Sequence, residues 1–143
     1  IYTTGMLPIA VTAQSPPVSN KEIFIDVEET IIWQMEMPNG AIAECRTSYS
    51  GEYQNFLKAE TDKGWFELNP AFSYDGIKSN TSDGKKLEFS KFSQQAKQMD
   101  GIAISIKNNQ ESIVPGEMGR RDMKIIEAIY KAMNTGKRVA IEW

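Results

Sequence analysis

Residues 31–49 read IIWQMEMPNGAIAECRTSY and carry the clearest structural signal in the chain. Apolar residues occupy alternate positions on both sides of Pro38-Asn39-Gly40, and an Asn-Gly pair between such segments is a strong local signal for a hairpin turn. Because successive side chains of a strand point to opposite faces, each flanking segment has one mostly apolar and one mixed face. The stretch therefore predicts an antiparallel β-hairpin.

Further strand-like segments lie on both sides of this hairpin, each bounded by turn-forming residues. We expect one strand before it, two more hairpins after it and a last strand at the end of the chain. The segments are residues 9–13, then 55–61 with 65–68, then 74–78 with 86–89, and finally 138–143. Since hairpin strands pair antiparallel, the resulting sheet should be mostly antiparallel.

Two helices are predicted before the last strand, where the apolar period changes from 2 towards 3.6. The first begins after Phe92 and has an apolar stripe made of Ala96, Met99, Ile102, Ala103 and Ile106. The stripe of the second consists of Met123, Ile126, Ile129, Tyr130 and Met133. Gly136 fits the position that follows a helix end.

This order of elements predicts an α+β fold, with an open, mostly antiparallel sheet of about six to eight strands and two helices packed on one face. Residues 1–143 are expected to form a single domain. A chain of this length buries roughly two-thirds of its unfolded surface on folding, so its core needs no disulfide or metal.

Composition excludes several kinds of site. The chain contains no histidine, and its one cysteine is Cys45. Histidine is the commonest metal ligand and general base, and a single cysteine can form neither an internal disulfide nor a thiolate cluster. A zinc site and a serine–histidine triad are therefore excluded, and Cys45 is expected to be a small buried hydrophobic residue.

Charge and hydropathy argue against two kinds of partner. The net charge is -3 and the pI is near 5.1, and the Lys and Arg pairs are short and scattered. Nucleic-acid binding needs basic residues clustered on one face, which is not the pattern here. A membrane span needs roughly 18 to 20 consecutive apolar residues, and no run approaches that length. We expect neither a nucleic-acid partner nor a membrane partner.

Carboxylates are plentiful, but no spacing singles out a catalytic pair. Asp26, Glu28 and Glu29 form an acidic run, which we interpret as the hydrated entry to a strand in preference to a metal site. The strand aromatics fit a sheet core or a subunit interface, and alternatively a platform on which a sugar stacks. Tyr74 and Asp75 are the pair that places an aromatic ring beside a carboxylate at a strand edge.

Two segments carry a resemblance to a known family, PAFSYDG at residues 70–76 and PGEMGRRD at residues 115–122. Shorter matching segments follow the same order as in that family. They are YTTG at 2–5, VTA at 11–13, DVEET at 26–30, MPNGA at 37–41, SYS at 48–50, GW at 64–65, IEAIY at 126–130 and TGK at 135–137. The ordered set covers nearly the whole chain. It resembles the C-terminal domain of the glucose-fructose oxidoreductase-like (Gfo/Idh/MocA) family of NAD(P)-dependent oxidoreductases.

The resemblance implies a full-length parent in which a Rossmann domain binds NAD(P) and precedes this substrate-side domain. It implies hydride transfer between a sugar or cyclitol and the nicotinamide. The family's glycine-rich loop, Glu-Lys-Pro motif and proton-handling residues all precede the segment that matches Tyr2. No residue here is therefore assigned a catalytic role, and no cofactor is expected to bind this chain alone. The start at Ile1, without an initiator Met, agrees with a fragment.

In the parent, the chain is expected to form one wall of the substrate cleft. The candidate substrate-binding residues are Tyr74, Asp75, Gln95 and Asp100, which are chosen for their polarity and position. The resemblance also implies a homodimer through the outer face of the sheet, and the expected compartment is the cytoplasm, with a periplasmic parent left open.

Two readings of another class remain. The chain could be a non-catalytic oligomerisation module that buries Trp33, Met35 or the aromatic residues of 65–72 against a twin, since interfaces favour such residues. It could also be a sugar-binding module that binds a monosaccharide by itself.

Overall fold

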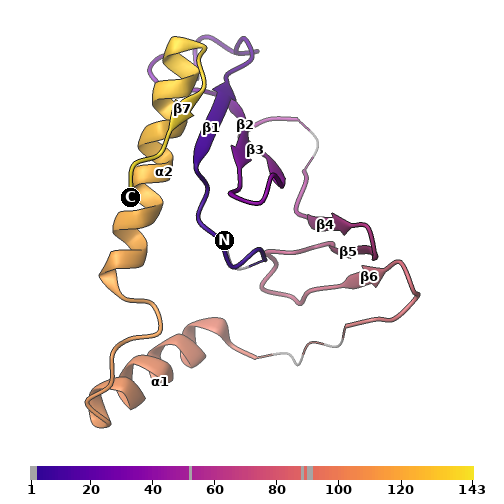
Figure 1. Cartoon of the computed structure of the whole chain (residues 1–143), viewed down its shortest axis with the longest axis vertical. Coiled ribbons are helices and arrows are strands. Elements are labelled where there is room, and N and C mark those ends of the chain that lie inside the picture. Colours follow the sequence, from indigo (N-terminus) through magenta and orange to yellow (C-terminus); the bar gives the residue numbers. More distant parts are fainter. Residues whose placement is uncertain (1–2, 52, 88, 90–91) are drawn as a thin grey trace. The chain divides into compact units, whose positions relative to one another are not determined.

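The structure is a computed structural model that describes residues 3–51, 53–87, 89 and 92–143 (Figure 1). By its internal contacts the chain divides into two compact units. The first unit combines Ile1–Glu52 with Gly116–Trp143, and the second unit is Tyr53–Pro115. The second unit is thus inserted between two parts of the first.

The hairpin at residues 31–49 is confirmed as β2 (Thr30–Glu36) and β3 (Ile42–Ser48). Its register places Trp33 opposite Cys45 and Met35 opposite Ala43. The turn closes through a hydrogen bond of 2.9 Å from the Gly40 amide to the Met37 carbonyl. Gly40 has a φ of +85°, a left-handed conformation that glycine adopts without steric cost.

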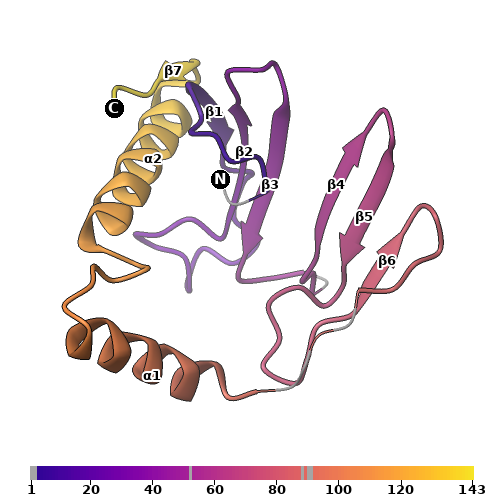
Figure 2. The same ribbon diagram turned by 60° about the horizontal axis from the view of Figure 1, so that its bottom comes forward.

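Two further predicted strands complete the sheet of the first unit. β1 (Ala10–Gln14) pairs with β2 on one side and with β7 (Val139–Ala140) on the other, always antiparallel. The order is β3-β2-β1-β7, so β7, from the end of the chain, forms an edge of the sheet beside β1, which comes from near its start (Figure 2). The strands predicted at 9–13 and 138–143 are therefore present, the second one in shortened form.

α2 (Gly116–Thr135) covers part of one face of this sheet. The core contains Val11 and Ile31 from the sheet and Ile125, Ile129 and Ala132 from the helix. Gly136 follows the helix with a φ of +64°, and its amide donates to the Ala132 carbonyl at 2.8 Å, so the predicted helix end is confirmed. The helix packs mainly on β1 and β7.

The buried stripe of α2 differs from the predicted one. The buried helix residues are Ile125, Ala128, Ile129 and Ala132, so the interior side is rotated from the predicted stripe and shares with it Ile129. Met123, Ile126 and Tyr130 are exposed. The apolar residues of α2 cover more than one side of the helix, and local periodicity cannot tell which side meets the sheet.

Trp33 and Met35 lie on the side of the sheet that carries α2, where they pack against the core. They are therefore not on the outer face, to which a twin was expected to bind. The outer face is polar instead. Gln34 donates to Glu44 at 2.9 Å, and Arg138 makes two hydrogen bonds to Glu36 at 2.8 and 2.7 Å.

The second unit contains a smaller antiparallel sheet with the order β4-β5-β6. The second predicted hairpin is confirmed as β4 (Leu57–Thr61) and β5 (Gly64–Leu68). The third hairpin is wrong as predicted. The strand is β6 (Ser79–Thr81), which pairs with β5, while residues 74–78 and 86, 87 and 89 lie outside strands and residue 88 lies outside the described part of the chain.

The predicted α+β class and the antiparallel pairing are confirmed, with the strands divided between a sheet of four and a sheet of three. The first predicted helix is α1 (Gln94–Lys107), whose start is capped by Ser93 accepting a hydrogen bond from the Ala96 amide at 3.3 Å. None of its residues is buried, in contrast to α2. None of the described helices is long and apolar enough to cross a membrane.

Replacing one of two adjacent isoleucines of α2 should separate its two sides. Ile125 is 9% exposed and belongs to the core, whereas Ile126 is 41% exposed. Ile125→Ala should destabilise the chain by about 2 to 5 kcal/mol, because it leaves a cavity. Ile126→Ala should cost less than about 1 kcal/mol. Urea unfolding followed by tryptophan fluorescence measures both, and equal losses would contradict the orientation of α2.

Gly64 provides a test of the small sheet. Its φ is +135°, and a Cβ atom placed there would lie 2.2 Å from Ser82 Oγ. Gly64→Ala should therefore cost about 1 to 3 kcal/mol, because the residue is strained and displaces Ser82. Gly101→Ala is the control, since nothing lies within 4 Å of that position in α1, and it should stabilise by about 0.5 to 1 kcal/mol. Both values come from thermal unfolding followed by circular dichroism.

Candidate functional site

The predicted pair Tyr74 and Asp75 lies in a turn of the loop between β5 and β6. The amide of Asp75 donates a hydrogen bond of 3.0 Å to Ser73 Oγ, which fixes the turn locally. The ring of Tyr74 is 77% exposed, and the Asp75 side chain is also exposed. The loop thus presents an aromatic ring and a carboxylate to solvent at adjacent positions.

The two other predicted residues lie on α1, in the same unit. Gln94 Nε2 donates to the Ser73 carbonyl at 3.4 Å, so the loop that carries Tyr74 and Asp75 touches the first turn of α1. Gln95 is in that turn and Asp100 is in the middle of the helix. Five positions correspond to about 140° around a helix and about 7.5 Å along it. The structure therefore brings Gln95 near the loop and places Asp100 on another side of α1.

Asn55 organises this loop and was not found by sequence reasoning. Its Oδ1 accepts hydrogen bonds from the amides of Ala71 at 3.0 Å and Phe72 at 2.7 Å, and its Nδ2 donates to the Tyr53 hydroxyl at 2.8 Å. One side-chain amide thus ties the Tyr53 hydroxyl to the backbone of residues 71 and 72, just before the turn that carries Tyr74. An asparagine two positions before a strand gives no sequence signal for such a role.

The chemistry of this loop suits binding more than catalysis. Exposed aromatic rings can stack on the C–H face of a sugar, and a carboxylate accepts hydrogen bonds from hydroxyl groups. Within the described residues, no group of three or more His, Cys, Asp or Glu side chains could hold a metal ion. We therefore treat the loop with Tyr74 and Asp75 as the candidate substrate-binding surface.

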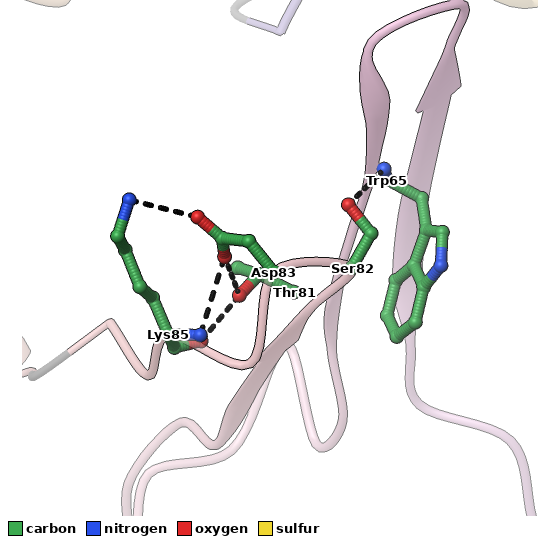
Figure 3. A network of polar contacts seen from close by, with 5 residues as sticks. All are labelled: Trp65, Thr81, Ser82, Asp83 and Lys85. Carbon is green, nitrogen blue, oxygen red and sulfur yellow. Dashed lines mark hydrogen bonds and ion pairs between the residues drawn. The ribbon is translucent and has the colours of Figure 1, made fainter.

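A polar network in the turn after β6 has a structural role. Asp83 accepts hydrogen bonds from Thr81 Oγ1 at 2.8 Å and from the Lys85 amide at 3.2 Å, and it pairs with Lys85 Nζ at 2.8 Å (Figure 3). The Lys85 ammonium and these other donors hold the pKa of Asp83 far below its usual range. The ring of Trp65 points away from Asp83 and Lys85. The carboxylate is satisfied within its own turn.

In the first unit, β2, the end of β3 and α2 enclose a hollow of about 260 Å³. Its lining includes Trp33, Tyr49, Ile126 and Tyr130. The hydroxyl of Tyr130 donates to Glu28, and this hydrogen bond raises the pKa of Tyr130 because it stabilises the neutral phenol. The lining of the hollow thus combines apolar side chains with the hydrogen-bonded pair of Glu28 and Tyr130.

The interpretation of the acidic run as a hydrated strand entry is wrong for Glu29. This residue is 5% exposed, and its carboxylate accepts hydrogen bonds from Ser19 and Ser50. The hydroxyl of Ser50, followed by the amide and hydroxyl of Ser19, lowers the pKa of Glu29. Both serines are distant in sequence, so the burial of this acid depends on tertiary structure. The carboxylate ties the loop before β2 to the end of β3.

Cys45 is half-buried in β3, where full burial was expected. Burial raises the pKa of its thiol, which keeps it protonated at neutral pH. A protonated thiol is a poor nucleophile, so the structure agrees with a structural role for Cys45.

Comparisons with known proteins give two informative matches and one negative result. No family model matches the chain. A solved structure of aldose-aldose oxidoreductase from Caulobacter crescentus in complex with glycerol has 33% sequence identity and a TM-score of 0.88 over 98% of this chain. A curated relative, D-xylose 1-dehydrogenase (NADP(+)) 2 of Haloferax volcanii, is 24% identical over 114 residues, or 76% of this chain.

Structures of lower identity show the same fold. Myo-inositol 2-dehydrogenase from Lactobacillus plantarum is 18% identical and has a TM-score of 0.75 over 99% of this chain. In each comparison the chain spans less than half of the relative, namely 43% of the Caulobacter protein, 44% of the Lactobacillus protein and 35% of the Haloferax protein. The chain belongs to the glucose-fructose oxidoreductase-like (Gfo/Idh/MocA) family and corresponds to its C-terminal domain.

Proposed function

We propose that this chain is the substrate-side domain of an NAD(P)-dependent sugar or cyclitol oxidoreductase and forms one wall of its substrate cleft. The observation that carries the proposal is the 33% identity to the Caulobacter aldose-aldose oxidoreductase, together with the TM-score of 0.88. The Haloferax relative, a xylose dehydrogenase that uses NADP(+), supports the same substrate class. The complete protein is expected to act in the cytoplasm.

We assign the redox chemistry to another part of the complete protein. That part would correspond to the portion of these relatives that this chain does not match. The nicotinamide carries the hydride, and the protein positions the donor and acceptor carbons and excludes water. This chain has no histidine and no glycine-rich nucleotide-binding loop. Its contribution is to bind and orient the sugar, and we assign no catalytic residue to it.

Substrate contact is proposed for the loop that carries Tyr74 and Asp75, with Gln95 next to it and Asp100 on the neighbouring helix. The exposure of Tyr74 and Asp75 and the contact between Ser73 and Gln94 support this choice. Asp75 would accept hydrogen bonds from sugar hydroxyls, while Tyr74 would stack on the ring of the sugar. Asn55 acts as a positioning residue, because its side chain bonds to the backbone of the loop and is not proposed to contact the sugar.

A homodimer through the outer face of the large sheet remains a proposal. The proposal is supported by the position of α2, which packs on the other face and leaves the outer face open to a partner. The ion pair between Glu36 and Arg138 gives the outer face a polar character. A twin would therefore meet polar side chains, in contrast to the aromatic and methionine contacts expected from the sequence. The same contact would serve a non-catalytic oligomerisation module.

The isolated chain should not bind the cofactor. We expect titration of the 143-residue chain with NADPH, followed by nucleotide fluorescence, to show no saturable change, because the chain lacks a dinucleotide-binding motif. The complete protein should bind NADPH and reduce NAD(P)+ with an aldose or a cyclitol as substrate. Saturable binding of NADPH by the isolated chain would contradict the division of labour proposed above.

Asp75→Ala in the complete protein should lower kcat/KM for the sugar roughly ten- to a hundredfold, the effect of losing hydrogen bonds to a charged group. The melting temperature should not change, because the Asp75 side chain is exposed. Asp62→Ala is the matched control, since Asp62 is an exposed carboxylate in the turn between β4 and β5. Steady-state kinetics measure both variants, and a loss of stability without a kinetic effect would exclude Asp75 from the cleft.

A further inference from the structure

A strip of the large sheet in the first unit has no helix over it. Because α2 packs mainly on β1 and β7, the same face of β2 beyond Ile31, and of β3, is only partly covered within the described residues. Figure 2 shows α2 beside β1 and β7, with β3 at the far edge of the sheet. The strip carries Trp33 and Met35 from β2 and their partners Cys45 and Ala43 from β3, all of them half-buried.

The side of α2 next to this strip is apolar and exposed. Met123, Ile126 and Tyr130 follow one another at helical spacing, and Ile126 and Tyr130 line the hollow of about 260 Å³ together with Trp33. The sequence predicted this stripe as core. The apolar character of the stripe is explained if another structural element, outside the sheet on which α2 packs, buries it.

A second exposed apolar segment lies beside the hollow. In the loop before β2, Ile23, Ile25 and Val27 are all exposed, Ile25 to 75%. Phe24 points to the ring of Tyr49, which lines the hollow, with ring centroids 6.3 Å apart. Contiguous apolar surface of this kind marks an interaction site in soluble proteins.

Trp33, which lines the hollow, carries an unsatisfied donor. Trp33 Nε1 is buried and has no hydrogen-bond partner among the residues that the structure describes. A buried donor without a partner costs free energy. The rim supplies a carboxylate, Glu28, which already accepts from Tyr130.

We infer that this surface, the β2–β3 face formed by Trp33, Met35, Ala43 and Cys45 with Ile126 and Tyr130, binds an amphipathic helix of the dinucleotide-binding domain. The inference rests on the proposed function. Neighbouring strands lie about 4.8 Å apart, and packed helices lie about 8 to 10 Å apart. The two strands beside α2 therefore offer the width of one further helix. This chain spans 43% of the Caulobacter structure, so most of that relative has no counterpart in this chain.

Two other occupants fit less well. A second copy related by a twofold axis that passes through the hollow would place hollow against hollow and Glu28 near Glu28, which leaves both concave sites empty and brings like charges together. A monosaccharide would fill the hollow but would leave Met123 and the segment of Ile23, Ile25 and Val27 exposed. A helix with an apolar side covers the strip, the stripe and the hollow at once.

The test compares the complete protein with the 143-residue chain by hydrogen–deuterium exchange. Amides of residues 23–27 and 123–130 should exchange at least tenfold more slowly in the complete protein. Ile126→Glu should lower the melting temperature of the complete protein by several degrees and lower that of the isolated chain much less, because Ile126 is exposed there. Lys131→Glu, which also adds a glutamate at an exposed position of α2, should change neither.

Equal exchange in both forms, or equal effects of Ile126→Glu and Lys131→Glu, would overturn the inference. So would a dimer of the isolated chain that Ile126→Glu dissociates in sedimentation, or saturable binding of xylose or glucose to the isolated chain that this substitution abolishes. A complete protein that shows the protection and the Ile126→Glu effect but no nicotinamide-dependent activity would support the helix site and refute the proposed function.

Discussion

The burial of one face of β1 under α2 is the constraint on which the first unit depends. Val11 is fully buried and packs with Ile129 and Ala132 of the helix. β1 lies near the start of the sequence, while α2 and β7 come from its end, so this core joins the two ends of the chain. The Ile141 amide donates to the Ile9 carbonyl at 2.9 Å, and Trp143 Nε1 donates to the Pro8 carbonyl at 2.9 Å, which extends the same junction. The second unit can be inserted because the core closes without it.

The two faces of the large sheet differ in polarity, because α2 packs on one of them and not on the other. The side under α2 is apolar, and its uncovered part at β2 and β3 leaves Trp33 half-buried. The other side carries hydrogen-bonded polar pairs such as Gln34 with Glu44. An apolar side favours permanent packing against another element, whereas a polar side remains compatible with water or with a wet interface. The two faces are therefore suited to different partners.

Ordered loops rely on single polar side chains in both units. Glu29 holds the loop before β2 through Ser19 and Ser50, and Asn55 holds the loop after β5 through the amides of Ala71 and Phe72. Each side chain satisfies several donors at once, which buried or turn-forming backbone requires. The exposed rings and carboxylate of the candidate site are consequently carried on a loop with a defined conformation.

The elements that depend on local rules could be predicted from the sequence. Alternation, helical period and glycine conformation predict the hairpins around Asn39-Gly40 and Lys63-Gly64, the presence of α2 and its end at Gly136. The ordered segments also indicated the family. Of the candidate site, the sequence suggested the pair Tyr74 and Asp75 as an aromatic ring beside a carboxylate at a predicted strand edge, whereas the structure places the pair in an exposed turn.

Features that depend on residues far apart in the chain became apparent in the folded structure. The folded structure shows that Ile125 and not Ile126 faces the sheet, and that Trp33 lies on the side of the sheet that carries α2. It also shows that β6 begins at Ser79 and that Glu29 is buried. It also identified Asn55 and separated Asp100 from the loop. Periodicity states that a helix has an apolar side, but which of several apolar residues is buried depends on the surface that packs against it, and that surface comes from another part of the sequence.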